Sequence, residues 1–82
     1  MVAAYIGLGA NLGAPAQAVR DAVAQLCRLP QTTLVRASSL YSSAPVDASG
    51  DDFVNAVALI DTGLAPQALL KALQQKIGRA HV

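Results

Sequence analysis

An apolar segment near the amino terminus, residues 2–8, runs directly into a turn of small residues, Gly9 to Gly13, and Pro15 follows closely. Apolar residues at both alternating positions are typical of a central strand covered by helices or by a ligand. Glycine ends such a strand, and proline suits the first turn of a helix because that turn needs no amide hydrogen. The chain therefore begins as strand, turn and helix, which limits it to folds in which a sheet and helices share one core.

The first helix is predicted over residues 15–28, and Pro30 ends it. Its apolar positions recur at three- and four-residue spacing: Val19, Ala22, Val23 and Leu26. The single cysteine, Cys27, falls on the same apolar face and cannot form an internal disulfide. We expect it to be a buried small hydrophobic residue rather than a reactive thiol.

Two more strands and a second helix follow. Residues 32–41, rich in threonine, valine and leucine, predict a strand, and residues 42–50 a loop that contains Pro45. Residues 53–61 predict a third strand, with Val54, Ala56, Ala58 and Ile60 on one face. Pro66 opens the second helix, whose expected buried stripe is Leu69, Leu70 and Leu73.

The resulting order, β-α-β-β-α, predicts an α+β fold of the ferredoxin-like type without its final strand. In that fold the last strand lies beside the first, so the edge of residues 2–8 is expected to be unpaired. An uncharged, unpaired edge is a template for association. We therefore expect the isolated chain to self-associate by edge pairing.

The 82 residues allow one domain, and a composition that is 54% hydrophobic and 13% charged is typical of a globular protein. The net charge is +1 and the six basic residues are scattered, which argues against a nucleic-acid-binding surface. The longest apolar runs are too short to cross a bilayer. We therefore expect no membrane partner, and we expect a cytoplasmic location. All five acidic residues are aspartates and no glutamate is present, so the sequence predicts no metal site.

Phe53 and Asn55 are the first candidates for ligand contact, because two residues that are two positions apart on a strand share a face. An aromatic ring can cover a flat heterocycle, and a carboxamide can both donate and accept hydrogen bonds at its edge. The alternative is that Phe53 fills the core while Asn55 satisfies a loop amide. Gly9 to Gly13 suits close approach to a ligand, but it lacks the lysine and glycine spacing of nucleotide motifs, and taken alone it is an ordinary turn.

Three segments in order resemble one enzyme family: Tyr5 to Leu12 (YIGLGANL), Tyr41 to Val46 (YSSAPV) and Phe53 to Asn55 (FVN). They are similar to the amino-terminal half of 6-hydroxymethyl-7,8-dihydropterin pyrophosphokinase. That family transfers diphosphate from ATP to a pterin alcohol in folate biosynthesis and uses Mg²⁺. The resemblance covers residues 2–76.

The resemblance implies a pterin site. Gly9 would let the substrate approach, and the backbone of Ser43, Ala44 and Val46 would meet the pterin edge on a loop stiffened by proline. Phe53 would stack on the ring, where the family more often has tyrosine, and Asn55 would bind its edge. Gln74 on the second helix would contact ATP.

The carboxyl terminus departs from the family. The catalytic and magnesium-binding segment of the family has no counterpart here, so no catalytic residue is assigned, and neither ATP nor Mg²⁺ is expected to bind productively. Residues 77–82, Ile-Gly-Arg-Ala-His-Val, coincide with a reading frame of a widely used sequencing adapter. We therefore expect residues 1–76 to be the amino-terminal part of a pterin pyrophosphokinase domain that is inactive alone, and residues 77–82 to be a non-native tail. The alternative function is a small ferredoxin-like ligand-binding or regulatory module.

Overall fold

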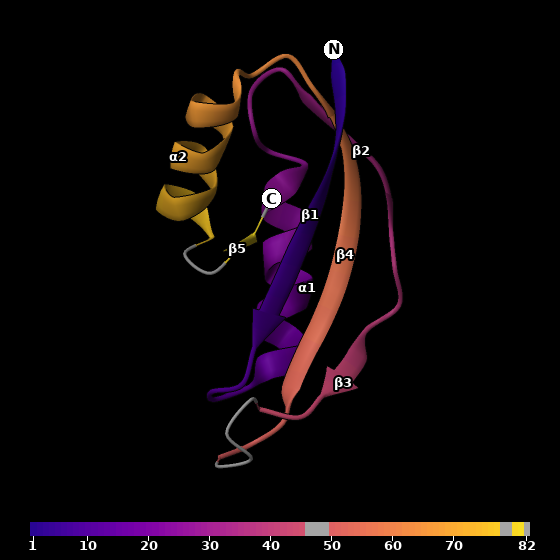
Figure 1. The fold of residues 1–82 in the computed structure, drawn as a ribbon, viewed down its shortest axis with the longest axis vertical. Helices are drawn as coiled ribbons and strands as arrows, with labels where there is room; N and C mark the ends of the chain where they lie inside the picture. Colours follow the sequence, from indigo (N-terminus) through magenta and orange to yellow (C-terminus); the bar gives the residue numbers. More distant parts are fainter. Residues whose placement is uncertain (46–49, 78–79, 82) are drawn as a thin grey trace.

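A computed structural model describes residues 1–45, 50–77 and 80–81. Its elements, in chain order, are β1 (Val2–Ala10), α1 (Pro15–Leu26), β2 (Thr32–Ala37), β3 (Tyr41–Ser43), β4 (Phe53–Thr62), α2 (Pro66–Lys76) and β5 (Ala80–His81) (Figure 1). Both helices begin at a proline, as predicted. Within the described residues no helix is long and apolar enough to span a membrane.

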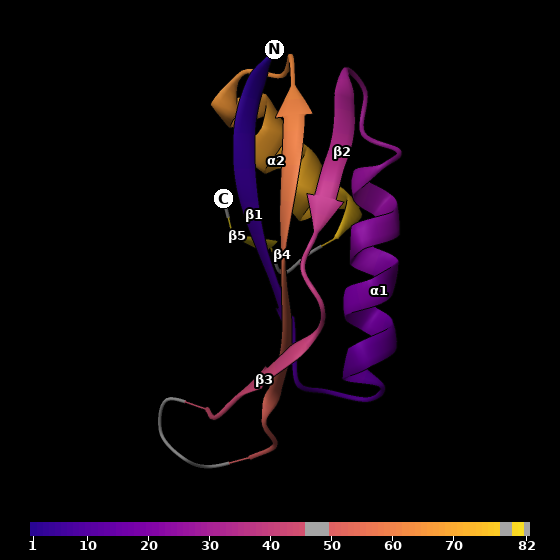
Figure 2. The ribbon, with the colours of Figure 1, turned by 90° about the vertical axis from the view of Figure 1, so that its right-hand side faces the viewer.

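The strands form one five-stranded antiparallel sheet in the order β2-β4-β1-β5, with β3 paired to the first residues of β4. Both helices lie against one face of this sheet, and the other face is free of helices (Figure 2). The arrangement confirms the predicted ferredoxin-like α+β fold. The helix-free face, called the open face below, carries Tyr5, Gly9, Tyr41, Ser43, Phe53, Asn55, Val57 and Leu59.

The core lies between the sheet and the two helices. Strands β1 and β4 supply every second residue, because side chains alternate between faces along a strand. The buried apolar side chains are Ile6, Leu8, Val19, Leu26, Leu29, Ala56, Ala58, Ile60, Leu69 and Leu73. The predicted division of β4 into two faces is thus confirmed. Helices cover only one face of β1, and Tyr5 on the open face is 63% exposed.

The predicted strand over residues 32–41 is two strands. A register shift between Leu34 and Arg36 bulges β2 at Val35, and the strand ends at Ala37. Ser38 then bonds to β4 outside the regular ladder: its amide donates to the Val57 carbonyl (2.8 Å) and its hydroxyl accepts from the Val57 amide (2.9 Å). The chain leaves the sheet and returns as β3, which begins inside the segment predicted to be a strand and extends into the predicted loop.

Two burial predictions on the helices are wrong. Helix α1 ends at Leu26, so Cys27 is the C-cap residue, and its side chain is exposed instead of packing in the apolar stripe. Its Sγ contacts the Val23 carbonyl at 3.8 Å. On α2, Leu70 is 43% exposed while Leu69 and Leu73 are buried, because adjacent helical positions are about 100° apart and only one side meets the sheet.

The outer edge of β1 is partly paired, which corrects the expectation of no strand beside it. The short β5 pairs with β1 at Gly7 and Leu8. Strand β1 itself continues through Gly9 to Ala10, two residues beyond the predicted end at Leu8. Among the described residues the remainder of this edge pairs with no strand.

Candidate functional site

The candidate site is built on the open face where three strands meet. Across the sheet, Gly9 of β1 pairs with Asn55 of β4, and Asn55 pairs on its other side with Tyr41 of β3. The next pair along β4 joins Phe53 to Ser43. Because paired residues in antiparallel strands put their side chains on the same face, the structure brings these five residues together.

Asn55 is the half-buried centre of this group. Its Nδ2 donates a hydrogen bond to Ser43 Oγ at 2.8 Å and a longer one to the Tyr41 carbonyl at 3.4 Å. These contacts tie the carboxamide to β3. They correct the alternative that Asn55 satisfies a loop amide, since both partners belong to a strand in the same sheet.

Gly9 makes room for the Asn55 carboxamide. A Cβ atom on Gly9 would lie 3.0 Å from Asn55 Oδ1, closer than almost all real Cβ contacts, and 3.9 Å from the Phe53 ring at Cδ1. The space that a side chain on Gly9 would take therefore borders the Asn55 carboxamide and the Phe53 ring. The sequence indicated that Gly9 admits a ligand; its contact with Asn55 appears only when the two strands are paired.

Phe53 is also half-buried and lies beside Asn55 on the open face, outside the core between sheet and helices. The alternative that Phe53 fills the core is thus wrong for this chain. A planar ring next to a fixed carboxamide offers a flat apolar surface and a hydrogen-bonding edge in one place. Such a pair suits a flat, polar-edged heterocycle.

Not all of the other predicted contact residues lie near Asn55. Ala44 directly follows Ser43 and is exposed, and Pro45 is half-buried. Val46 lies outside the described residues. Gln74 is exposed on α2, which lies on the opposite side of the sheet from Asn55 (Figure 2). The structure therefore does not bring Gln74 into the group around Asn55.

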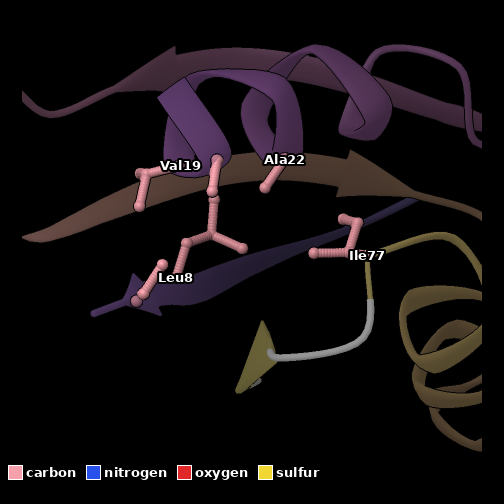
Figure 3. A pocket seen from close by; sticks show the side chains of 7 residues that line it. Leu8, Val19, Ala22 and Ile77 are labelled. Atoms are coloured by element: carbon pink, nitrogen blue, oxygen red, sulfur yellow. The ribbon is translucent and has the colours of Figure 1, made fainter. Parts of the chain in front are cut away.

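A separate apolar cavity of about 350 Å³ lies on the helix side of the sheet. Figure 3 shows Leu8 of β1 facing Val19 and Ala22 of α1, with Ile77 at the side. Its lining contains no polar side chain, so no side chain there could form a hydrogen bond with a ligand. The small side chains of α1 leave this space, but their sequence pattern did not distinguish them from ordinary core residues.

The open face also carries a shallower hollow of about 210 Å³, lined by Tyr5, Arg36, Ala37, Ser38, Val57 and Leu59. Across residues 1–45, 50–77 and 80–81, no three His, Cys, Asp or Glu side chains are grouped so that they could hold a metal ion.

Comparison with known proteins relates the chain to one family. Residues 5–81 match the family model described as 7,8-dihydro-6-hydroxymethylpterin-pyrophosphokinase (HPPK). A 2-amino-4-hydroxy-6-hydroxymethyldihydropteridine pyrophosphokinase of Pseudomonas putida is 48% identical over 73 residues, which is 89% of this chain and 61% of the relative.

Relatives with the same name occur in Haemophilus influenzae and Pseudomonas aeruginosa. The first is 43% identical over 76 residues, covering 92% of this chain and 48% of the relative. The second is 48% identical over 71 residues, covering 85% of this chain and 44% of the relative. The chain thus spans about half the length of the curated relatives that it matches.

Proposed function

This chain belongs to the 7,8-dihydro-6-hydroxymethylpterin-pyrophosphokinase family, and from that membership we propose that residues 1–76 are the amino-terminal part of a domain that binds a pterin alcohol. In the intact enzyme, diphosphate passes from ATP to the hydroxymethyl group of 6-hydroxymethyl-7,8-dihydropterin, a step of folate biosynthesis. The role of this part of the chain is to bind and orient the pterin.

The group formed by Gly9, Ser43, Phe53 and Asn55 carries the proposal. A pterin has a flat bicyclic ring and an edge of alternating hydrogen-bond donors and acceptors. Phe53 would cover the ring face, and the carboxamide of Asn55 would meet the edge. The backbone of Ser43, Ala44 and Val46 would complete that edge. Binding on a sheet, where the side chains are already held, limits the entropy lost on association.

We further propose that the 82-residue chain is not active alone. Diphosphoryl transfer depends mainly on positioning and on cations that neutralise the moving phosphoryl group. Among the described residues no three acidic, histidine or cysteine side chains are grouped so that they could hold an ion. Gln74 remains the proposed ATP contact, but it is exposed and lies across the sheet from the pterin group.

The test is thermal unfolding of the 82-residue chain with and without 6-hydroxymethylpterin. We expect the pterin to raise the melting temperature, since a ligand that binds the folded state stabilises it. Asn55→Ala should abolish the rise. Gln67→Ala, which removes an exposed carboxamide on α2, across the sheet from Asn55, is the matched control. Protection by small amino acids and not by pterin would favour the alternative regulatory module. Turnover of ATP to AMP by this chain would contradict its proposed inactivity.

Two further proposals concern the ends of the chain. Residues 77–82 are proposed to be a non-native tail, which the genomic sequence downstream of codon 76 would test directly. Self-association through β1 is proposed because β5 pairs with only two residues of this nine-residue strand in the described part. Strand β1 contains no charged residue, proline or bulge that would discourage a second copy from pairing there.

A further inference from the structure

We propose that the hollow of about 210 Å³ on the open face, bordered by Tyr5 and Arg36, is a binding site for a small aromatic carboxylate. The hollow is separate from the group formed by Gly9, Ser43, Phe53 and Asn55. The proposal therefore does not rest on the proposed pterin function.

The hollow is built across three strands around Leu59 of β4. Leu59 pairs with Tyr5 of β1 on one side and with Arg36 of β2 on the other. Paired residues in antiparallel strands share a face, and their backbones across two strand spacings are about 10 Å apart. Val57, two positions earlier on β4, continues the floor. Tyr5 is 63% exposed while Leu59 and Val57 are half-buried, so an apolar floor lies between an aromatic wall and a cationic one.

The bulge in β2 puts Arg36 on this face. In an unbroken ladder Leu34 and Arg36 would point the same way, because side chains alternate along a strand. Leu34 pairs with Ile60, which is fully buried on the helix side of the sheet. The register shift between Leu34 and Arg36 places Arg36 opposite Leu59 instead. The guanidinium group thus reaches the open face only through the bulge.

The lining indicates the chemistry of the ligand. Among the described residues that line the hollow, Arg36 alone is charged. Its planar guanidinium fork matches a carboxylate with two parallel hydrogen bonds. The Tyr5 ring and the apolar floor suit an aromatic ring. Asp61, the next open-face residue of β4 after Leu59, does not line the hollow and so does not oppose an anion inside it.

The size of the hollow limits the ligand to one ring. An apolar cavity of about 150 Å³ holds benzene. A hollow of about 210 Å³ therefore holds a single ring together with its carboxylate group. Pockets for drug-sized ligands are larger, at about 300–1,000 Å³.

A different role for Arg36 is protection of the sheet edge. Strand β2 is the last strand of the described sheet on its side, and a charge or a bulge on an edge strand discourages pairing with another chain. That role requires a positive charge, but it requires neither a guanidinium fork nor Tyr5. Edge protection alone therefore predicts no binding of a carboxylate.

The test is a titration of the ¹⁵N-labelled 82-residue chain with sodium benzoate at constant ionic strength, followed by NMR. We expect saturable shifts of the Val57 and Leu59 amide resonances. Benzamide keeps the ring without the charge, and acetate keeps the charge without the ring. Both should bind at least about tenfold more weakly than benzoate, since each lacks one of the two interactions.

Variants of the two walls assign the contacts. Arg36→Gln should weaken benzoate binding by about tenfold or more, the range for a hydrogen-bonded charge, and Arg36→Lys should fall between Arg36→Gln and the unmodified chain. Tyr5→Leu should weaken it by about threefold or more, while Tyr5→Phe should retain it. Arg20→Gln removes the same charge from an exposed position on α1, across the sheet, and is the matched control.

Equal affinities of the unmodified chain and Arg36→Gln for benzoate would overturn the proposal, and so would equal affinities for benzoate and benzamide. Shifts centred on Phe53 and Asn55 that persist in Arg36→Gln would place benzoate in the pterin group and would also overturn it. Failure of the unmodified chain to bind 6-hydroxymethylpterin would contradict the pterin function alone, because these measurements contain no pterin.

Discussion

Asn55 lies directly opposite Gly9 in the β1–β4 ladder, and its carboxamide oxygen is 3.0 Å from the position that a Cβ at residue 9 would take. Two residues that are 46 positions apart in sequence thus form one structural unit. The same carboxamide is held on its other side by Ser43 and the Tyr41 carbonyl.

Replacing Gly9 with alanine should weaken pterin binding through Asn55. The new methyl group would lie 3.0 Å from Oδ1, so the carboxamide would have to shift by a few tenths of an ångström while its nitrogen is bonded to Ser43. We expect a loss of about five- to tenfold in affinity, measured by titration calorimetry. A double-mutant cycle supplies the control: Gly9→Ala should have little further effect once Asn55→Ala has removed the carboxamide. Additive losses would show that Gly9 acts independently of Asn55.

Phe53 should contribute to pterin affinity through its ring. Phe53→Ala removes the stacking surface beside Asn55, and we expect affinity to fall by about tenfold, whereas Phe53→Tyr should retain it. Val35→Ala, an exposed side chain at the bulge of β2, is the control for general effects of truncation. Equal affinities for Phe53→Ala and the original chain would remove Phe53 from the site.

The buried hydroxyl of Thr62 should stabilise the end of β4. Its Oγ1 lies 2.8 Å from Thr32 Oγ1 and accepts a hydrogen bond from the Leu64 amide at 3.1 Å. Thr62→Val would leave that amide without its partner, so we expect the free energy of unfolding to fall by about 1–3 kcal/mol in urea titrations. Thr33→Val, at an exposed position on β2, should change it by less than about 0.5 kcal/mol. A similar change in both variants would contradict this role.

Leu73 and Leu70 should differ sharply in their effect on stability although both are leucines on α2. Leu73 is fully buried and Leu70 is 43% exposed. Leu73→Ala should lower the free energy of unfolding by about 2–5 kcal/mol, enough to unfold much of so small a domain. Leu70→Ala should cost under about 1 kcal/mol. Circular dichroism during urea titration measures both, and equal losses would mean that α2 presents a different face to the sheet.

A charge on the edge of β1 should reduce self-association of the 82-residue chain. Ala3 is exposed on β1, outside the two residues that β5 covers. Ala3→Lys places a charge where a second strand would pair, so sedimentation velocity should show a shift toward monomer. Ala24→Lys, exposed on α1, adds the same charge elsewhere and should have no such effect. A chain that is monomeric at millimolar concentration before substitution would contradict edge pairing.

Local patterns were sufficient for much of the architecture. Prolines at the first helical turn located the start of both helices, and the alternation of residues 53–61 assigned each side chain of β4 to the correct face. The failed prediction of a single strand over residues 32–41 has a long-range cause. The bulge at Val35 and the replacement of ladder bonds by Ser38 divide one predicted strand into two, and both depend on pairing with β4.

The candidate site likewise depends partly on local sequence patterns and partly on long-range pairing. The two-residue spacing of Phe53 and Asn55 was enough to put them on one face, because side-chain direction alternates along any strand. That this face is the helix-free one, that Gly9 lies under the carboxamide, and that Ser43 holds its nitrogen depend on register between strands distant in sequence. Such register follows from burying one face of the whole sheet against two helices, a property that no single segment carries.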